Sequence, residues 1–446
     1  MTFDEAVAYL DSLMPLGMRL TLDRIRALCE EFGHPERAFR TVHVAGTNGK
    51  GSTATMVSRI LMCSGLRTGL FVSPYVLTVR ERAQVDGVFI PERTFADLIE
   101  EVRPVAERIS HSVGHPTEFE VKTIVALLHF ARSQVDYAVM EVGLGGRYDS
   151  TNVIVPDVAA ITNVTLDHVD RLGDTVEKIA WEKAGIIKDR VPCVTAAEGA
   201  ALSVVEAEAR AHEAPLYRLG REITIEFEQD GSFAVAVAGK RYGGLRTGML
   251  GEFQRTNAAV AVAAAHLLAD KGVPVSAEAV REGLATAYAP GRLEVLRRNP
   301  TLVLDGAHNA DGAAKLRRAL TTLFNYRRLI LVAGMTRGHS ISDVIGTLAP
   351  IAHLVIATAP ASPRAASAPD VASAAEACGT PARVVQGVPS AVRAALEEAT
   401  PDDLVCVAGS FYTVGEVPRD GNQREGAGEG AAGAATATAN QERVES

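Results

Sequence analysis

The chain has 446 residues, a formal net charge of −9 and 47% hydrophobic residues. This length exceeds what one hydrophobic core usually serves, so we expect two domains. The acidic charge argues against general nucleic-acid binding. No run of about 18 apolar residues suggests a membrane span, and no charged-then-apolar leader is visible at the N-terminus.

The five cysteines are scattered along the chain, are odd in number and include no C-x-x-C pair. This usage indicates a reducing compartment and speaks against a structural zinc site. We therefore expect a cytoplasmic protein.

The chain begins with two predicted amphipathic helices, at residues 2–13 and 21–32. A short apolar run at 41–45 then predicts a buried strand. Residues 52–64 predict a helix, because apolar side chains recur there at helical spacing, and Gly65 ends it.

The segment between this strand and this helix is Gly-Thr-Asn-Gly-Lys-Gly-Ser, residues 46–52. A strand, a glycine-rich turn and a helix N-terminus form a cradle for phosphate, because backbone N–H groups and the helix dipole attract anions. Lys50 adds a mobile positive charge. The pattern departs from a strict Walker A box, since Val44 takes the place of its first glycine. A plain glycine-rich turn with a surface lysine is the alternative.

Further strands are predicted at 68–72, 136–142 and 157–161, and further helices at 119–132 and 177–187. Strands that alternate with helical patterns are typical of βαβ units and a mainly parallel sheet. Residues 222–240 differ, because hydrophobic residues alternate on both sides of an Asp-Gly turn. That pattern predicts a small antiparallel appendage. A helix at 253–268 and a linker near 289–291 follow.

The last part of the chain repeats the α/β pattern, with strands predicted at 301–304, 329–333, 354–358 and 404–408. We expect an α/β protein with a P-loop mononucleotide-binding domain at 1–289 and a smaller C-terminal Rossmann-like α/β domain at 290–418. Residues 419–446 contain too few large apolar side chains to bury, so we expect a disordered tail there.

Several polar residues lie at or just beyond the ends of predicted strands, namely Ser73, Glu141, His168 and Asp305. Ligands of parallel sheets collect at the carboxyl ends of strands. A hydroxyl and a carboxylate suit Mg²⁺ held with ATP phosphates. His168 is a less usual magnesium partner and could be structural, and Glu141 could be a buried, paired carboxylate. The charged loop at 80–82 fits either a solvated hairpin edge or a ligand contact.

Six motifs now form one ordered set, and they are Val-Ala-Gly-Thr-Asn-Gly-Lys-Gly-Ser (44–52), Phe-Val-Ser-Pro-Tyr (71–75), Glu-Val-Gly-Leu-Gly-Gly-Arg-Tyr-Asp-Ser-Thr-Asn (141–152), Leu-Asp-His (166–168), Glu-Lys-Ala-Gly-Ile-Ile-Lys (182–188) and Leu-Asp-Gly-Ala-His-Asn (304–309). The set resembles the folylpolyglutamate synthase/dihydrofolate synthase family of Mur-type amide ligases. The resemblance runs from about residue 15 to 417.

The resemblance implies a reaction in which ATP phosphorylates a substrate carboxylate and the amine of L-glutamate attacks the acyl phosphate. Phosphorylation turns a poor leaving group into a good one, so the protein must position ATP and offset the charge of the transferred group. The implied ligands are ATP, Mg²⁺ at two sites, L-glutamate and a folate or dihydropteroate. We expect a monomer without nucleic-acid or membrane partners.

The resemblance also implies a role for individual residues. Those expected to bind ATP are Asn48, Gly49, Lys50, Gly51, Ser52, Asn257, Arg292, Asp305 and His308. Those expected to bind metal are Ser73, Glu141, His168 and Lys183, the last as a carbamylated lysine. Substrate contacts are expected from Arg82, Phe119, Asp149, Ser150 and Thr151, and catalytic roles from Lys50, His168 and Lys183.

Two other functions compete with this one. A Mur-type ligase could act on another carboxylic acid, although the Glu-Val-Gly-Leu-Gly-Gly-Arg stretch favours the folate branch. A nucleotide-binding switch protein belongs to a different class, and a GTPase of that class would carry an Asn-Lys-x-Asp box, which the sequence lacks.

Overall fold

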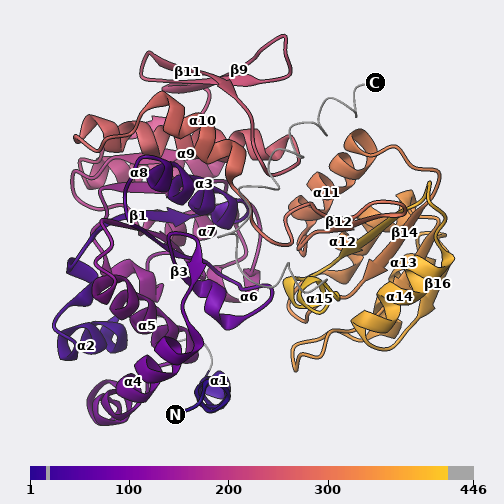
Figure 1. Ribbon diagram of the computed structural model, residues 1–446, viewed down its shortest axis with the longest axis horizontal. Coiled ribbons are helices and arrows are strands. Elements are labelled where there is room, and N and C mark those ends of the chain that lie inside the picture. Colours follow the sequence, from indigo (N-terminus) through magenta and orange to yellow (C-terminus); the bar gives the residue numbers. More distant parts are fainter. Residues whose placement is uncertain (17–20, 420–446) are drawn as a thin grey trace. The chain divides into compact units, whose positions relative to one another are not determined.

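The computed structural model describes residues 1–16 and 21–419, which form two compact units (Figure 1). The first unit consists of Met1–Thr247 and Arg255–Ala287, and the second of Gly248–Gln254 and the chain from Tyr288 onward. The domain boundary that we placed between residues 289 and 290 stays a prediction. Within the described residues, none of the helices has both the length and the apolar character that crossing a membrane requires.

An eight-stranded sheet forms the centre of the first unit, in the order β4-β3-β2-β5-β1-β6-β7-β8. Its strands are β1 (Arg40–Ala45), β2 (Thr68–Phe71), β3 (Ala83–Val85), β4 (Val88–Phe89), β5 (Tyr137–Glu141), β6 (Val158–Ile161), β7 (Cys193–Thr195) and β8 (Leu216–Arg218). Strands β2, β5, β1, β6, β7 and β8 pair in parallel, and β3 and β4 form an antiparallel edge. The central strands are buried on both faces, as continuous apolar runs of parallel strands require.

The register of the central strands determines where the site lies. Val44 pairs with Glu141, and Ala45 pairs with Ile161. Phe71 pairs with Met140 on the other side of β5. Strands β2, β5, β1 and β6 therefore end at the same level of the sheet, and the loops that follow them lie along one edge.

The helices and short 3-10 segments of the first unit are α1 (Phe3–Leu13), η1 (Met14–Leu16), α2 (Asp23–Glu31), η2 (Pro35–Arg37), α3 (Lys50–Cys63), η3 (Val79–Arg82), α4 (Glu92–Val113), α5 (Glu118–Arg132), η4 (Ser150–Val153), α6 (Val169–Leu172), α7 (Val176–Ala184), α8 (Gly199–Ala211), α9 (Phe253–Asp270) and α10 (Ala277–Thr286). Helix α4 was not among the predicted elements, nor were α8, α10 and strands β7 and β8.

Two apolar clusters hold these layers together. One cluster packs α1, α2, α4 and α5 against the sheet and includes Phe71 of β2 and Phe130 of α5. The other packs α7 and α8 against β6 and β7. Helix α9 is rich in alanine, and Ala258 to Ala265 are fully buried, which permits close approach of neighbouring backbone.

The antiparallel appendage is confirmed as a three-stranded sheet of β9 (Ile223–Phe227), β10 (Phe233–Val237) and β11 (Lys240–Leu245). Gly231 has a positive φ of 78° at the turn between β9 and β10, which is where the Asp-Gly pair predicted it.

The second unit contains a six-stranded sheet in the order β12-β13-β17-β14-β15-β16, parallel except for β12. Its strands are β12 (Glu294–Arg297), β13 (Thr301–Leu304), β14 (Leu329–Ala333), β15 (Leu354–Ala357), β16 (Ala382–Val384) and β17 (Leu404–Ala408), and its helical segments are α11 (Ala310–Leu323), α12 (Ile341–Leu348), η5 (Ala349–Ile351), α13 (Ala368–Glu376), α14 (Val388–Glu398) and α15 (Phe411–Gly415). The expected smaller α/β fold is confirmed.

Arg419 is wrongly included in the predicted disordered tail. Its side chain is buried and donates to both carboxylate oxygens of Glu294, at 2.5 and 3.1 Å. A buried bidentate ion pair fixes both partners, which composition alone does not reveal. The rest of that prediction, residues 420–446, lies outside the described residues.

We predict that Arg419→Ala lowers the free energy of unfolding of the second unit by about 3–5 kcal/mol, because it leaves the Glu294 carboxylate buried without its cation. Urea denaturation of the full chain measures this. Arg383→Ala is the matched control, since its ion pair with Glu398 is partly exposed and contributes less than about 1 kcal/mol. Equal losses in the two variants would contradict the prediction.

Candidate active site

The glycine-rich loop between β1 and α3 is held in place by the loop that follows β6. The backbone N–H of Thr47 donates to the Asn163 carbonyl at 2.7 Å, and that of Asn48 donates to Asn163 Oδ1 at 2.8 Å. Thr162 Oγ1 donates to the Asn48 carbonyl at 2.7 Å. Gly49 then begins helix α3 as its N-cap, with a φ of 86°. The loop thus has the strand–turn–helix context of a phosphate cradle.

Two lysines meet at this loop. Lys50 Nζ donates to the carbonyls of Gly46 and Thr47, both at 3.0 Å, and Lys183 Nζ donates to the same Gly46 carbonyl at 2.8 Å. Helix α7 therefore brings Lys183 to the phosphate loop from far along the chain.

Lys183 is a buried amine with a lowered pKa, and it lies near the charge of Lys50. Burial, assisted by the nearby charge of Lys50, lowers the pKa of Lys183 to about 7, although Asp167, Glu182 and Asp149 oppose the shift. Its side chain is 4% exposed. A large share of Lys183 is consequently a neutral, nucleophilic amine near neutral pH.

Three of the four predicted metal ligands lie at or beyond the carboxyl ends of β2, β5 and β6, and the fourth, Lys183, lies on α7. Glu141 ends β5, is 1% exposed and accepts the Ser73 backbone N–H at 2.8 Å. His168 follows β6 with a φ of 48°, and its Nε2 lies 3.9 Å from Asp167 Oδ2. The structure brings Ser73 and Glu141 into contact and sets His168 on the same edge of the sheet. A buried carboxylate and a hydroxyl are donors that suit Mg²⁺.

Phe119 and Arg82 form one side of a second cluster. The Arg82 guanidinium lies 5.4 Å from the ring centroids of both Phe119 and Tyr75. A Cβ added to Gly143 would lie 2.3 Å from Phe119 Cζ, so the Phe119 ring rests directly on the glycine stretch after β5. Arg82 therefore lies against two aromatic rings, and its expected contact with a ligand stays a prediction. Lys122, which sequence reasoning missed, lies 5.5 Å from the Tyr75 ring centroid.

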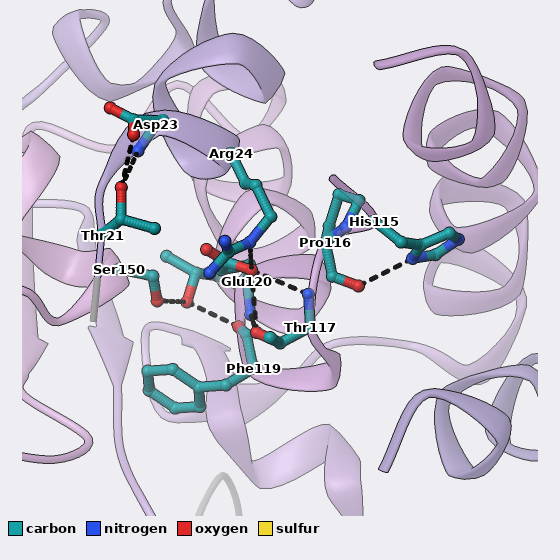
Figure 2. A network of polar contacts seen from close by, with 10 residues as sticks. Thr21, Asp23, Arg24, His115, Pro116, Thr117, Phe119, Glu120 and Ser150 are labelled. Atoms are coloured by element: carbon teal, nitrogen blue, oxygen red, sulfur yellow. Dashed lines mark hydrogen bonds and ion pairs between the residues drawn. The ribbon is translucent and has the colours of Figure 1, made fainter. Parts of the chain in front are cut away.

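The N-terminus of α5 holds Phe119 in place (Figure 2). Thr117 and Glu120 form a capping box, and the Glu120 carboxylate also accepts from Arg24 Nε at 2.9 Å. Arg24 and Glu120 are both buried, so this ion pair ties α2 to α5 beside Phe119. Sequence reasoning did not identify the pair, because its members are far apart in the chain.

Asp149 and Ser150 belong to a buried turn at η4. Asp149 Oδ1 accepts from the N–H and the hydroxyl of Thr151, at 3.0 and 2.6 Å, and Oδ2 accepts from the Leu144 N–H at 2.9 Å. Burial raises the pKa of Asp149, and these donors oppose the shift. Ser150 Oγ lies 2.7 Å from Thr123 Oγ1, which donates to the Phe119 carbonyl (Figure 2).

Asn257 of α9 borders the phosphate loop. A Cβ added to Gly49 would lie 2.2 Å from Asn257 Oδ1. The structure therefore brings Asn257 to the loop at which the ATP-binding residues 48–52 were expected. Asn163, which also holds this loop, was missed, although a Thr-Asn pair directly after an apolar strand is a signal for such a site.

In the second unit, Asp305 follows β13 and accepts the backbone N–H groups of Leu293 and Ala307, each at 2.8 Å. Burial raises the pKa of Asp305 to about 6, and Arg292 opposes the shift. The His308 ring lies 4.8 Å from that of His339 and 6.0 Å from that of Phe411, over which Arg292 also lies at 4.2 Å. Three of the predicted ATP-binding residues are thus neighbours of one strand end.

Two family models match the chain in succession. The Mur ligase middle domain matches residues 44–265, and the Mur ligase, glutamate ligase domain matches residues 291–411. A dihydrofolate synthase/folylpolyglutamate synthase of Bacillus subtilis is 35% identical over 429 residues, covering 93% of this chain and 98% of that protein.

The chain belongs to the dihydrofolate synthase/folylpolyglutamate synthase family. Two solved structures of relatives agree. Escherichia coli FolC, determined with DHPP and ADP, superposes with a TM-score of 0.84 at 31% identity, covering 93% of this chain and 96% of that chain. The bifunctional Yersinia pestis synthase, determined with AMPPNP and a Mn ion, gives 0.83 at 31% identity, with coverage of 93% and 97%.

Membership of this family makes the chain an ATP-dependent ligase with the α/β fold of folylpolyglutamate synthases. The predicted enzyme class and fold class are confirmed. The switch-protein alternative is no longer needed, because both matched domains are ligase domains.

We predict that Gly49→Ala raises KM for ATP at least about tenfold, because a Cβ there would overlap the Asn257 side chain and displace the phosphate loop. Steady-state kinetics with varied ATP measures the effect. Gly65→Ala is the matched control. Gly65 has a similar φ, 80° against 86°, but its added Cβ meets nothing within 4 Å. An unchanged KM for ATP in Gly49→Ala would refute the assignment of this loop as the ATP-binding site.

Proposed function

We propose that the chain joins L-glutamate to the carboxylate of a folate or of dihydropteroate, using ATP and an acyl phosphate intermediate. The observation that carries this proposal is the meeting of Lys50 and Lys183 at the Gly46 carbonyl of the phosphate loop, in a chain of this family. The charge of Lys50 beside the phosphate cradle offsets the negative charge that develops when a phosphoryl group is transferred, while Lys183, through its proposed carbamate, holds a divalent cation beside it.

The proposed ATP-binding residues are Asn48, Gly49, Lys50, Gly51, Ser52, Asn257, Arg292, Asp305 and His308. The backbone of the phosphate loop and the N-terminus of α3 suit an anion, and Lys50 supplies a mobile charge. The Yersinia pestis relative was determined with AMPPNP, an ATP analogue, which supports ATP as the nucleotide here.

A divalent cation is the second cofactor, supported by the Mn ion of the same relative. The residues fit Mg²⁺, because a buried carboxylate at Glu141 lies against Ser73 and thiolate clusters are absent among the described residues. We propose Ser73, Glu141, His168 and a carbamylated Lys183 as its ligands, at two sites. The bound cation supplies charge neutralisation on the ATP phosphates.

The proposed substrate contacts are Arg82, Phe119, Asp149, Ser150 and Thr151. The cluster of Arg82 with Phe119 and Tyr75 presents aromatic and cationic surface, which suits a flat ring with an anionic tail. Relatives carry both synthase names, so we propose that both dihydropteroate and reduced folates are substrates. The chain's five cysteines are free thiols, which supports the proposed cytoplasmic location. The expected monomeric state stays a prediction.

The proposed activity is tested by incubating the purified chain with ATP, Mg²⁺ and L-glutamate, and with either dihydropteroate or tetrahydrofolate. We expect mass spectrometry to detect addition of one glutamate to each. Lys50→Ala should fold normally yet lower kcat at least about a hundredfold, because it removes charge stabilisation from the phosphoryl transfer. Failure of the wild type on both substrates would refute the function, and a normal kcat for Lys50→Ala would refute the role of the loop.

Carbamylation of Lys183 has its own test. A neutral amine reacts with CO₂ to form a C–N bond, giving a carbamate and releasing one proton to solvent, and the anionic carbamate is attracted to a cation. Lys183→Ala should lose most activity and regain part of it with a small carboxylic acid, and ¹³C-bicarbonate should give a carbamate signal only in the wild type. Lys178→Ala is the matched control, since Lys178 lies exposed on the same helix. An active Lys183→Ala without the signal in the wild type would contradict the proposal.

A further inference from the structure

His43 is a fully buried histidine on β1, the strand that leads into the phosphate loop, and it has no assigned role. Its Nε2 lies 2.8 Å from Oγ1 of Thr151. Thr151 Oγ1 in turn donates to Oδ1 of Asp149 at 2.6 Å. A buried chain of hydrogen bonds thus connects β1 with the turn at η4.

The direction of each hydrogen bond in this chain follows from proton counting. Asp149 accepts the Leu144 N–H at Oδ2, and the Thr151 N–H and hydroxyl at Oδ1, so Oδ1 is the acceptor toward Thr151. The single hydroxyl proton of Thr151 is given to Asp149, so His43 must supply the proton between Nε2 and Oγ1. The other ring nitrogen, Nδ1, is buried without a hydrogen-bond partner. It is therefore the bare nitrogen, since a buried N–H is rarely left unpaired.

The charge state of His43 agrees with this arrangement. Burial lowers the pKa of His43 to about 3, and the nearby charge of Lys188 adds to the effect. The imidazole ring is consequently neutral at physiological pH, so only one of its two nitrogens carries a proton and can donate a hydrogen bond.

The turn at η4 is held from two sides. Thr151 is tied to β1 through His43, and Ser150 is tied through Thr123 to the carbonyl of Phe119 (Figure 2). The phosphate loop is held separately, by Thr162 and Asn163. Loss of the His43 donor should therefore disturb the turn while leaving the phosphate loop in place.

We propose that His43 is a positioning residue that fixes the turn at residues 149–151 and thereby the pocket for the pterin-bearing substrate. The proposal rests on the proposed function for the identity of that substrate. His43 does not touch the reacting atoms in this scheme. It acts through Thr151 and Asp149.

Kinetics of two substitutions test the role. His43→Leu removes the donor and should raise KM for the pterin substrate about tenfold, the effect of losing one buried hydrogen bond, while KM for ATP stays within about twofold. His43→Gln places an amide N–H near the position of Nε2 and should restore most of the affinity. A merely structural role would move both KM values together or would not distinguish the two variants.

Thr41→Val is the matched control. Thr41 lies two residues earlier on β1, is buried, and its Oγ1 has no hydrogen-bond partner. Removing this hydroxyl should leave both KM values unchanged. A KM for the pterin substrate that rises as much in Thr41→Val as in His43→Leu would overturn the proposal.

A double-mutant cycle tests whether His43 acts through Thr151. Thr151→Val removes the hydroxyl, so adding His43→Leu to it should raise KM for the pterin substrate little further. Fully additive effects would mean that the two residues act independently, which contradicts the proposal.

The ring proton gives a readout that needs no turnover. The ¹⁵N-histidine NMR spectrum of the full chain should contain a neutral ring with protonated Nε2 and bare Nδ1 that is assigned to His43 by its absence from the spectrum of His43→Gln. A protonated Nδ1, or a doubly protonated ring near pH 7, would refute the hydrogen-bond chain. If the wild type uses neither pterin substrate but the NMR signal is found, the proposed function fails while the hydrogen-bond chain stands.

Discussion

Four consecutive polar side chains, Asp149 to Asn152, are buried, and each is hydrogen-bonded to a different part of the first unit. Asp149 holds the glycine stretch after β5, Ser150 reaches α5, and Thr151 reaches β1. Asn152 donates to the Gly185 carbonyl at the end of α7 and accepts from Lys188. Buried polar groups are costly unless each is paired, so this segment allows only one arrangement of its neighbours.

The phosphate loop depends on a similar constraint at a neighbouring strand end. Parallel register brings the loops after β2, β5, β1 and β6 to one edge of the sheet. There, Asn163 accepts a hydrogen bond from a backbone N–H of the phosphate loop. The lowered pKa of Lys183 is a consequence of that convergence, because the amine is buried there and lies near the charge of Lys50.

Much of this arrangement follows from local sequence. The strand–turn–helix around Lys50 was predictable because glycine spacing and apolar periodicity are short-range signals. The positions of Ser73 and Glu141 were predictable because each directly follows an apolar run. Helix α4 was missed, and so was the buried pair of Arg24 with Glu120, whose members lie far apart in sequence. No local signal reports which distant charge a buried residue meets.

The sequence by itself determined the α/β class, the antiparallel appendage, the ligase family and the residues that surround the strand ends. Tertiary structure alone decided that Lys183 and Lys50 share one carbonyl, that His43 meets Thr151, and that Arg419 is buried against Glu294. The reason is physical. Periodicity and turn residues act over a few positions, whereas pKa shifts, ion pairs and proton directions depend on which groups the fold brings within hydrogen-bond distance.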